Sequence, residues 1–386
     1  ALGQSALKLN TTGSYNTAVG QGALNSNTTG AGNVSVGYNA LSSNTTSSKS
    51  TAIGFNAAAV STATNQTVMG YDALRNCTTG KENTAIGVES LFTCTTGTEN
   101  AAVGYYSLYA LTTGSYNTAM GPNGCLSSLT TANDNTAMGA QAATSTTTGH
   151  SNVVIGKQAM YSAGAVNKSV VIGMQAMYTH TGTGDEQNVY IGFQAGYDGT
   201  TGYNNTFVGG RAGVSITTGN ANTSIGYQAG NNATTGSFNI CLGREANPSS
   251  ATASNECTLG DGNVSTLRCN DTSISSLSDR RDKTDIVDLP NGLNFLNTLR
   301  PVKFKWATRD GNVKDGKIRA GFIAQELQEA QKDFDFLDLV MDNNPDKLEA
   351  KQEHLVPVLV KAVQELSAKN DELAAEIASL KSQINN

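Results

Sequence analysis

Apolar and polar residues alternate in a short pattern that repeats along the first two thirds of the chain. Residues 16–20, Asn-Thr-Ala-Val-Gly, show the pattern: a polar residue, two small or β-branched residues, an apolar residue and a glycine. The glycine recurs from Gly3 to Gly260 at steps of about 17 residues, which makes sixteen copies. A few steps are one residue shorter or one or two residues longer. A period of this length predicts a repeat architecture.

The alternation with period two predicts a short β-strand in each copy. The residue before the glycine is apolar, and we expect it to face the interior. These residues are Val19, Val36, Ile53, Met69, Ile86, Val103, Met120, Met138, Ile155, Ile172, Ile191, Val208, Ile225, Leu242 and Leu259. The glycine would end the strand at a corner that needs positive φ or a close approach of two backbones. A Thr-Thr-Gly turn closes many copies.

A unit of about 17 residues is too short to hold a strand, a crossover helix and a second strand. We therefore predict a mostly β protein whose residues 1–262 form a parallel β-solenoid or β-roll, with one coil per unit. Stacked at about 4.8 Å, sixteen coils would make a rod of roughly 75 Å. Asparagine usually stands four residues before the glycine, as at Asn83 and Asn100. We expect these amides to hydrogen-bond along the axis; a sugar-binding ladder is the alternative.

Near-identical coils create a problem of register. A shift of one chain by a whole coil against a partner costs little, because every coil offers nearly the same surface. Parallel pairing between distant segments is also slow, and the ends of the stack expose strand edges. We expect a separate segment at one end to set the register.

The density of charge changes sharply near residue 278. Residues 1–277 hold 21 charged side chains, whereas residues 278–386 hold 35. Between the two regions, residues 263–277 form a connector rich in Ser, Thr and Asn. Such a break indicates two architectures, with a second domain over residues 278–386.

The pattern of the second domain predicts a small α+β fold. Residues 292–299 are amphipathic, residues 302–306 alternate as a strand would, and residues 321–327 read as a strand leading into a helix. From Leu355 the chain has heptad order, which predicts a coiled coil over residues 355–386. The a positions are Val356, Val363, Asn370, Ile377 and Ile384, and the d positions are Leu359, Leu366, Leu373 and Leu380.

Composition excludes several classes of function. The net charge of −6 does not provide the excess of positive charge that nucleic-acid binding needs. No apolar run approaches the length of a membrane span. The six cysteines form no Cys-x-x-Cys pair, and we interpret them as small buried residues. We nominate no cofactor-binding or metal-ligating residue. Ala1 lies inside a repeat, so we expect the sequence to be the C-terminal part of a longer protein.

Two resemblances follow from these motifs. The repeats of residues 1–262 resemble the β-roll heads of bacterial trimeric adhesins and the shafts of bacteriophage tail fibres. The motifs at residues 278–283 (Ser-Asp-x-Arg-x-Lys), 299–306, 321–327 and 355–366 resemble the intramolecular chaperone domain at the C-terminus of phage endosialidases and tail fibres. The same self-cleaving domain occurs in the myelin regulatory factor family.

The second resemblance implies a homotrimer in which the C-terminal domain guides folding and then cuts itself off. Carried over by position, Ser278 is the nucleophile, Lys283 is the base, and the cleaved bond joins Leu277 to Ser278. A lysine acts as a base only in its neutral form. Positively charged neighbours such as Arg280 and Arg281 favour that form, while Asp279 and Asp282 oppose it.

The sequence therefore favours a trimeric viral fibre or adhesin that binds a glycan or protein receptor on a host cell, located in the virion and joined to other tail proteins upstream. Its enzymology would be limited to self-cleavage by a serine–lysine peptidase. One alternative is the stalk of a glycan-degrading tailspike, with the enzyme upstream of Ala1. Others are a trimeric adhesin on a bacterial surface and an ice- or carbohydrate-binding solenoid that uses its threonine ladders.

Overall fold

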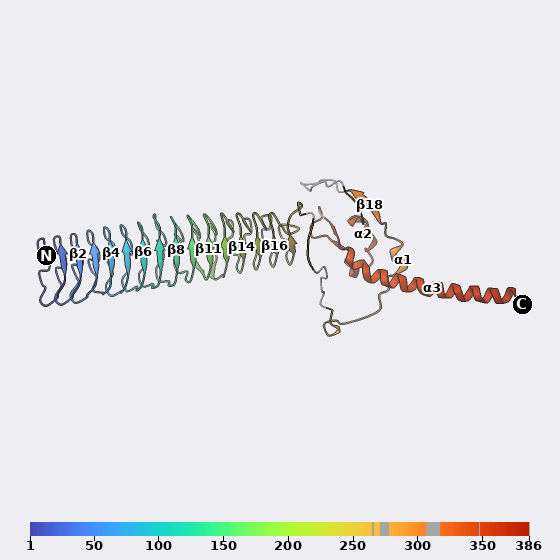
Figure 1. The fold of residues 1–386 in the computed structure, drawn as a ribbon, viewed down its shortest axis with the longest axis horizontal. Helices are drawn as coiled ribbons and strands as arrows, with labels where there is room; N and C mark the ends of the chain where they lie inside the picture. The colour runs from blue at the N-terminus through green and yellow to red at the C-terminus, as the bar shows by residue number, and fades with distance from the viewer. Residues whose placement is uncertain (265, 271–277, 306–316, 347, 386) are drawn as a thin grey trace. The chain divides into compact units, whose positions relative to one another are not determined.

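The computed structural model describes residues 1–264, 266–270, 278–305, 317–346 and 348–385. Contacts divide the chain into two units, Ala1–Asp261 and Gly262–Asn386. The first unit is a parallel β-solenoid and the second is a small α+β unit with a long C-terminal helix (Figure 1). The prediction of a mostly β parallel solenoid with one coil per repeat unit is confirmed.

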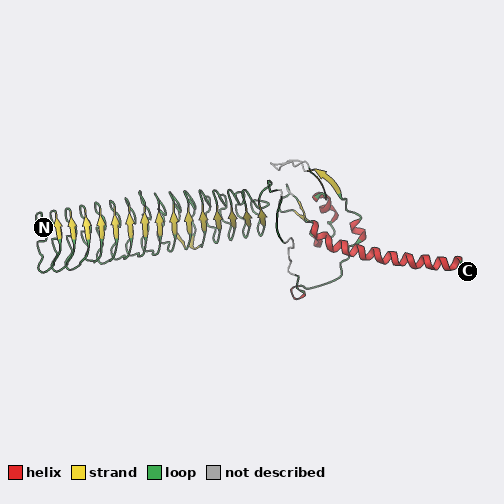
Figure 2. Cartoon of the chain, in the orientation of Figure 1, coloured by secondary structure: helices red, strands yellow, loops and turns green. Residues whose placement is uncertain are grey.

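Fifteen three-residue strands form one parallel sheet along the solenoid (Figure 2). An isolated bridge from Leu2 to Val19 adds the first coil. A separate two-stranded sheet, β10 (Ala165–Asn167) with β12 (Thr183–Asp185), spans two neighbouring coils, of which the second is two residues longer than most. The sheet strands are β1 Thr17–Val19, β2 Val34–Val36, β3 Thr51–Ile53, β4 Thr67–Met69, β5 Thr84–Ile86, β6 Ala101–Val103, β7 Thr118–Met120, β8 Thr136–Met138, β9 Val153–Ile155, β11 Val170–Ile172, β13 Val189–Ile191, β14 Thr206–Val208, β15 Thr223–Ile225, β16 Ile240–Leu242 and β17 Cys257–Leu259.

The prediction that the apolar residue before each glycine faces inward is wrong. In β5, Ala85 is fully buried, whereas Thr84 and Ile86 on either side of it are partly exposed. The same parity holds from β1 to β16. We call the row of residues before the glycines, from Val19 to Leu259, the apolar stripe; none of its members is buried. The interior of a coil is narrow, so the smaller residue of each alternating pair occupies it and the larger one points outward.

The inward residue is matched in size to a partner across the coil. In several coils a small residue faces a leucine, as Ala102 faces Leu108, and both side chains are fully buried. Two neighbouring coils reverse this arrangement, because Phe207 is fully buried and stands opposite Gly213. A Cβ atom on Gly213 would lie 2.6 Å from the Phe207 ring. In these two coils a large–small pair thus replaces the small–large pair of the leucine-containing coils.

The corner glycine is required by the approach of successive coils. Gly87 has φ +135°, and a Cβ atom there would lie 2.5 Å from the carbonyl oxygen of Gly104 in the next coil. The predicted amide ladder is also present. Asn117 Nδ2 donates to Asn100 Oδ1 at 3.1 Å, and Asn100 Nδ2 donates to Asn83 Oδ1 at 3.2 Å. These buried amides link each coil to the next, which satisfies their polar groups without water.

Four of the six cysteines, Cys77, Cys94, Cys125 and Cys241, are buried and unpaired, as the sequence indicated. Cys257 and Cys269 are exposed, so the interpretation as buried residues fails for these two. Cys257 is the first residue of β17, a position that is not buried in any strand of the large sheet, and Cys269 lies in the connector after the repeats.

The second unit contains α1 (Leu293–Leu296), β18 (Val302–Lys305), β19 (Ile318–Gly321), α2 (Ala324–Ala330), β20 (Val340–Met341), β21 (Glu349–Ala350) and α3 (Leu355–Ile384), with short 3-10 turns η1 (Arg280–Asp282), η2 (Asp335–Leu337) and η3 (Gln352–His354). β18 pairs with β19 and β20 with β21, both antiparallel. The core is formed by Phe295, Leu327, Leu337, Leu339, Val340, Leu355 and Val358. The predicted strand at 302–306 and the strand-to-helix element at 321–327 correspond to β18 and to β19 with α2; Trp306 lies outside the described residues.

Candidate functional site: Ser278 and Lys283

A tight turn brings the two candidate catalytic side chains together. Lys283 Nζ donates to Ser278 Oγ at 2.5 Å, although the residues are five positions apart. Between them runs the 3-10 turn η1, in which Asp282 N–H donates to the carbonyl of Asp279 and Lys283 N–H to that of Arg280. The turn therefore folds the chain back so that a lysine and a serine meet, which is the contact that a base and its nucleophile need.

The acidic and basic neighbours of this pair are themselves paired. Asp279 caps η1 by accepting from Arg281 N–H at 2.8 Å, and its carboxylate also lies 2.6 Å from the Arg281 guanidinium. The Arg281 side chain holds the pKa of the Asp279 carboxyl below its usual value. The charges of Asp279 and Arg281 therefore largely offset each other beside the Ser278–Lys283 contact.

Ser278 and Lys283 are both exposed in the single chain. Leu277, the residue on the other side of the predicted cut, lies outside the described residues. The contact between lysine and serine is thus present in one chain, whereas burial of the pair is not.

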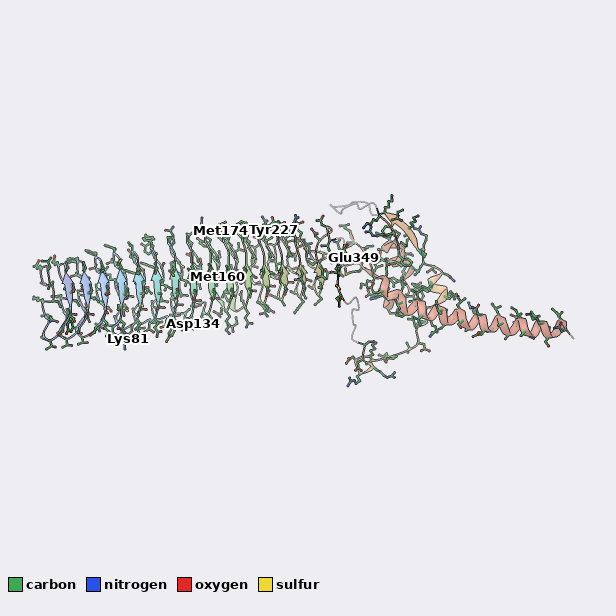
Figure 3. All side chains as sticks on the ribbon, viewed as in Figure 1. Lys81, Asp134, Met160, Met174, Tyr227 and Glu349 are labelled. Carbon is green, nitrogen blue, oxygen red and sulfur yellow. The ribbon has the colours of Figure 1, made fainter. Side chains whose placement is uncertain are left out.

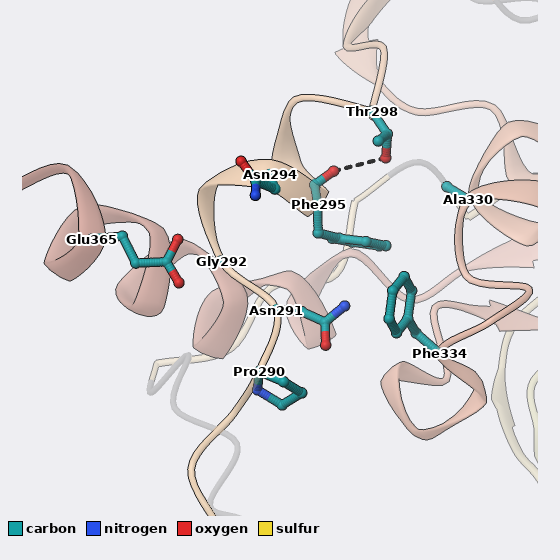
Figure 4. A pocket seen from close by; sticks show the side chains of 9 residues that line it. All are labelled: Pro290, Asn291, Gly292, Asn294, Phe295, Thr298, Ala330, Phe334 and Glu365. Atoms are coloured by element: carbon teal, nitrogen blue, oxygen red, sulfur yellow. Dashed lines mark hydrogen bonds between the residues drawn. The ribbon is translucent and has the colours of Figure 1, made fainter. Parts of the chain in front are cut away.

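Figure 4 shows a cavity of about 370 Å³ elsewhere in the same unit, between α1, α2 and α3. Glu365 of α3 lines it and accepts from the Leu293 N–H at 2.7 Å, which satisfies a free donor at the start of α1. A Cβ atom on Gly292 would lie 2.5 Å from the Glu365 carboxylate, so a side chain there would displace that carboxylate. Neither Ser278 nor Lys283 lines this cavity. No sequence signal pointed to Glu365, because its partner lies far away in the chain.

Comparison with known families decides the nature of this unit. Residues 278–336 match the family described as chaperone of endosialidase. The match begins at Ser278, the residue placed against Lys283, and runs through α1, β18, β19 and α2. No curated protein matches the chain. The chain therefore joins a β-solenoid to a segment similar to the chaperone of endosialidase, an arrangement that is consistent with a phage tail fibre or tailspike with a C-terminal chaperone.

The described residues offer neither a metal centre nor a membrane span. Within those ranges, no three His, Cys, Asp or Glu side chains gather closely enough to hold a metal ion. Among the same residues, every helix is too short or too polar to cross a membrane.

Proposed function

We propose that the chain belongs to a trimeric fibre or adhesin that binds a receptor on a host cell, and that its chaperone domain cuts itself off between Leu277 and Ser278. The observation that carries this proposal is the contact between Lys283 Nζ and Ser278 Oγ at the first residue of the chaperone-family match. The family is one of intramolecular chaperones with autoproteolysis. We place the protein in the virion, joined to tail proteins upstream.

The proposed cleavage uses Ser278, Lys283, the carbonyl of Leu277 and one water molecule. Neutral Lys283 accepts the proton of the Ser278 hydroxyl, and Oγ attacks the carbonyl carbon of Leu277. The tetrahedral intermediate then breaks its C–N bond, and the Ser278 nitrogen takes the proton from Lys283, which leaves an ester between Leu277 and Ser278 Oγ. Water hydrolyses this ester to a Leu277 carboxylate and a free serine. Because nucleophile and carbonyl are adjacent in the chain, effective molarity replaces substrate binding.

Two exposed apolar surfaces support self-association. The first is the heptad seam of α3, where Leu359, Leu366, Leu373 and Leu380 are each about half exposed in the single chain. The second is the apolar stripe, which is continuous over fifteen strands. Contiguous apolar surfaces of this length mark interaction sites rather than free faces. Copies of the same chain would offer surfaces that match along the whole length, and the family resemblance sets their number at three.

Self-association would also complete the peptidase. Packing of neighbouring chains around η1 would remove water from Lys283 and favour its neutral form. Cleavage would then follow assembly, so that the chaperone leaves after the register of the coils has been set.

The threonine rows give the ice-binding alternative little support. In the Thr-Thr-Gly turns the hydroxyl of Thr78 donates to the carbonyl of Thr95 at 3.0 Å, and the hydroxyl of Thr95 donates to the carbonyl of Thr112 at 3.1 Å. These hydroxyls stabilise the stacking of one coil on the next.

The test of the proposed cut is the mass of the purified protein. The wild type should split after Leu277, while Ser278→Ala and Lys283→Ala should each keep the full 40.0 kDa. Lys332→Ala, which changes another exposed lysine of the same unit, should be cut like the wild type. Hydroxylamine should trap the ester as a hydroxamate at Leu277, which an external protease would not produce. Processing of Ser278→Ala at Leu277 would refute the assignment of the nucleophile.

A further inference from the structure

The aromatic ladder of the solenoid is interrupted where one coil carries an extra residue. Phe92 and Tyr109, in successive coils, stack with their ring centroids 5.4 Å apart and an angle of 3° between the ring planes. In the next coil Ser127 takes the position of Tyr109. The backbone hydrogen bond from the Thr93 N–H to the Tyr109 carbonyl is repeated one coil later by the bond from the Ala110 N–H to the Ser127 carbonyl. The step between corner glycines, from Gly121 to Gly139, is one residue longer here than in most coils. One face of Tyr109 is therefore covered by Phe92, and no ring follows on the other side.

A pocket of about 690 Å³ opens at this interruption. Its lining residues are Tyr105, Tyr106, Tyr109, Ala110, Asn123, Gly124, Ser127 and Ser128. Gly124, with φ +83°, belongs to the inserted segment and leaves the wall without a side chain. The volume lies within the range of sites that hold a small organic ligand.

The three tyrosines are arranged differently from the rest of the ladder. The ring plane of Tyr106 lies at 61° to that of Tyr105, with the centroids 4.0 Å apart. It lies at 88° to that of Tyr109, with the centroids 4.9 Å apart, so the rings form a corner instead of a parallel stack. A hydrogen bond with Tyr105, followed by desolvation and the charge of Glu89, raises the pKa of Tyr106.

The polar groups of the pocket are neutral. None of the eight lining residues is charged. Within the described part of the chain, the side chains of Asn123, Ser127 and Ser128 make no hydrogen bond. Ring faces beside neutral donors and acceptors suit a sugar, whose C–H faces pack on aromatic rings while its hydroxyls form hydrogen bonds. No cationic side chain lines the pocket to pair with an anionic sugar.

The pocket leaves the apolar stripe free. It is lined by residues that follow the corner glycines, and no residue of β6 or β7 contributes to it. Met174 and Tyr227, which hold the position of Tyr105 in later coils, lie along one edge of the solenoid in Figure 3, while Lys81 and Asp134 lie along the opposite edge. Packing of copies through the stripe is therefore compatible with an occupied pocket.

We propose that the Tyr105–Tyr106–Tyr109 pocket binds a neutral saccharide, a hexose or N-acetylhexosamine unit of a surface glycan. This inference rests on the proposed receptor binding and narrows the receptor from glycan or protein to a neutral glycan at a named place.

The test uses the full-length fibre on an array of immobilised oligosaccharides that contains neutral hexose and N-acetylhexosamine chains and their sialylated counterparts. The wild type should bind at least one neutral chain. Tyr109→Ala should weaken that binding about tenfold or more, the loss of one main stacking contact. Tyr178→Ala is the matched control, because Tyr178 holds the same position in its coil but lies stacked between Tyr161 and Tyr197. It should bind like the wild type.

Ser127→Tyr guards against a simple loss of folding. It continues the ladder across the gap, so it should abolish binding while the thermal stability stays equal or rises. Binding by Ser127→Tyr at wild-type strength would overturn the site, as would equal losses in Tyr109→Ala and Tyr178→Ala or wild-type binding restricted to sialylated chains. A wild type that binds no neutral chain, yet forms trimers and cuts itself, would refute this site and leave the assembly part of the proposed function standing. Absence of trimers and of cleavage would refute the proposed function itself.

Discussion

At the scale of the residue, the solenoid is governed by volume matching inside each coil. Replacing Phe207 by Ala should leave a cavity and cost about 3–5 kcal/mol. The double variant Phe207→Ala with Gly213→Leu should recover most of this loss, because it recreates the pair that Ala102 and Leu108 form elsewhere. Leucine tolerates that backbone, since Leu108 has φ 51° and Gly213 has φ 57°. Thermal denaturation of the purified fibre would measure both effects.

Gly213→Leu alone serves as the control and should be the least stable variant, since its side chain would collide with the Phe207 ring. A double variant no more stable than Phe207→Ala would contradict the exchange of volume between the two positions.

At the scale of the element, α3 presents a seam that its own chain leaves uncovered. Leu373 occupies a d position and is 54% exposed. In a Ser278→Ala background, which would keep α3 attached, Leu373→Asp should place a charge in the seam and reduce the trimer to lower masses. Light scattering would measure the mass. Ala375→Asp, two residues away on the outer face of the helix, should leave the trimer intact. A trimer that survives Leu373→Asp would place the interface elsewhere.

Also at this scale, the start of α1 depends on α3 through Glu365. Glu365→Ala removes the acceptor of the Leu293 N–H, whose bond is 2.7 Å long. A partly buried hydrogen bond to a charged group contributes about 1.5–3 kcal/mol, so the melting temperature of the chaperone unit should fall. Calorimetry of the Ser278→Ala protein would detect this. Replacement of Glu372, which is exposed on the same helix, should change the melting temperature little.

At the scale of the whole molecule, the chaperone unit should set the register of the coils. A chain that stops after residue 277 should give aggregated or unassembled protein, since near-identical coils can pair out of register. Deletion of one whole coil, residues 88–104, is the matched control. It removes a single repeat unit while joining equivalent positions, and should still yield soluble trimers. Size-exclusion chromatography with light scattering would compare the two, and soluble trimers from the truncated gene would contradict the proposal.

Much of the architecture was predictable because the sequence repeats with a nearly constant period. Evenly spaced glycines defined the coil, and the corner at Gly87 follows from the lack of room for a Cβ atom. The amide ladder through Asn83 and Asn100 was also predictable. Amides at the same position of successive coils lie next to each other, and buried amides need hydrogen-bond partners. Heptad order likewise predicted a helix, which the structure places at Leu355–Ile384.

The orientation of each strand was not predictable in the same way. A three-residue strand with period two offers two parities, and hydrophobicity favoured the larger residue, such as Ile86, for the interior. The structure buries Ala85 instead. The size of the coil interior decided this, and that size depends on residues on the other side of the coil, such as Leu91.

By itself, then, the sequence determined the repeat, the two-part organisation and the family motifs, because each is encoded in residues at fixed spacing. The tertiary structure alone decided which face of the strand is buried, that Arg281 engages Asp279, and that the gap at Ser127 opens a pocket beside three tyrosines. These features arise from contacts between coils or across a turn, where the space left by one residue depends on neighbours that spacing does not reveal.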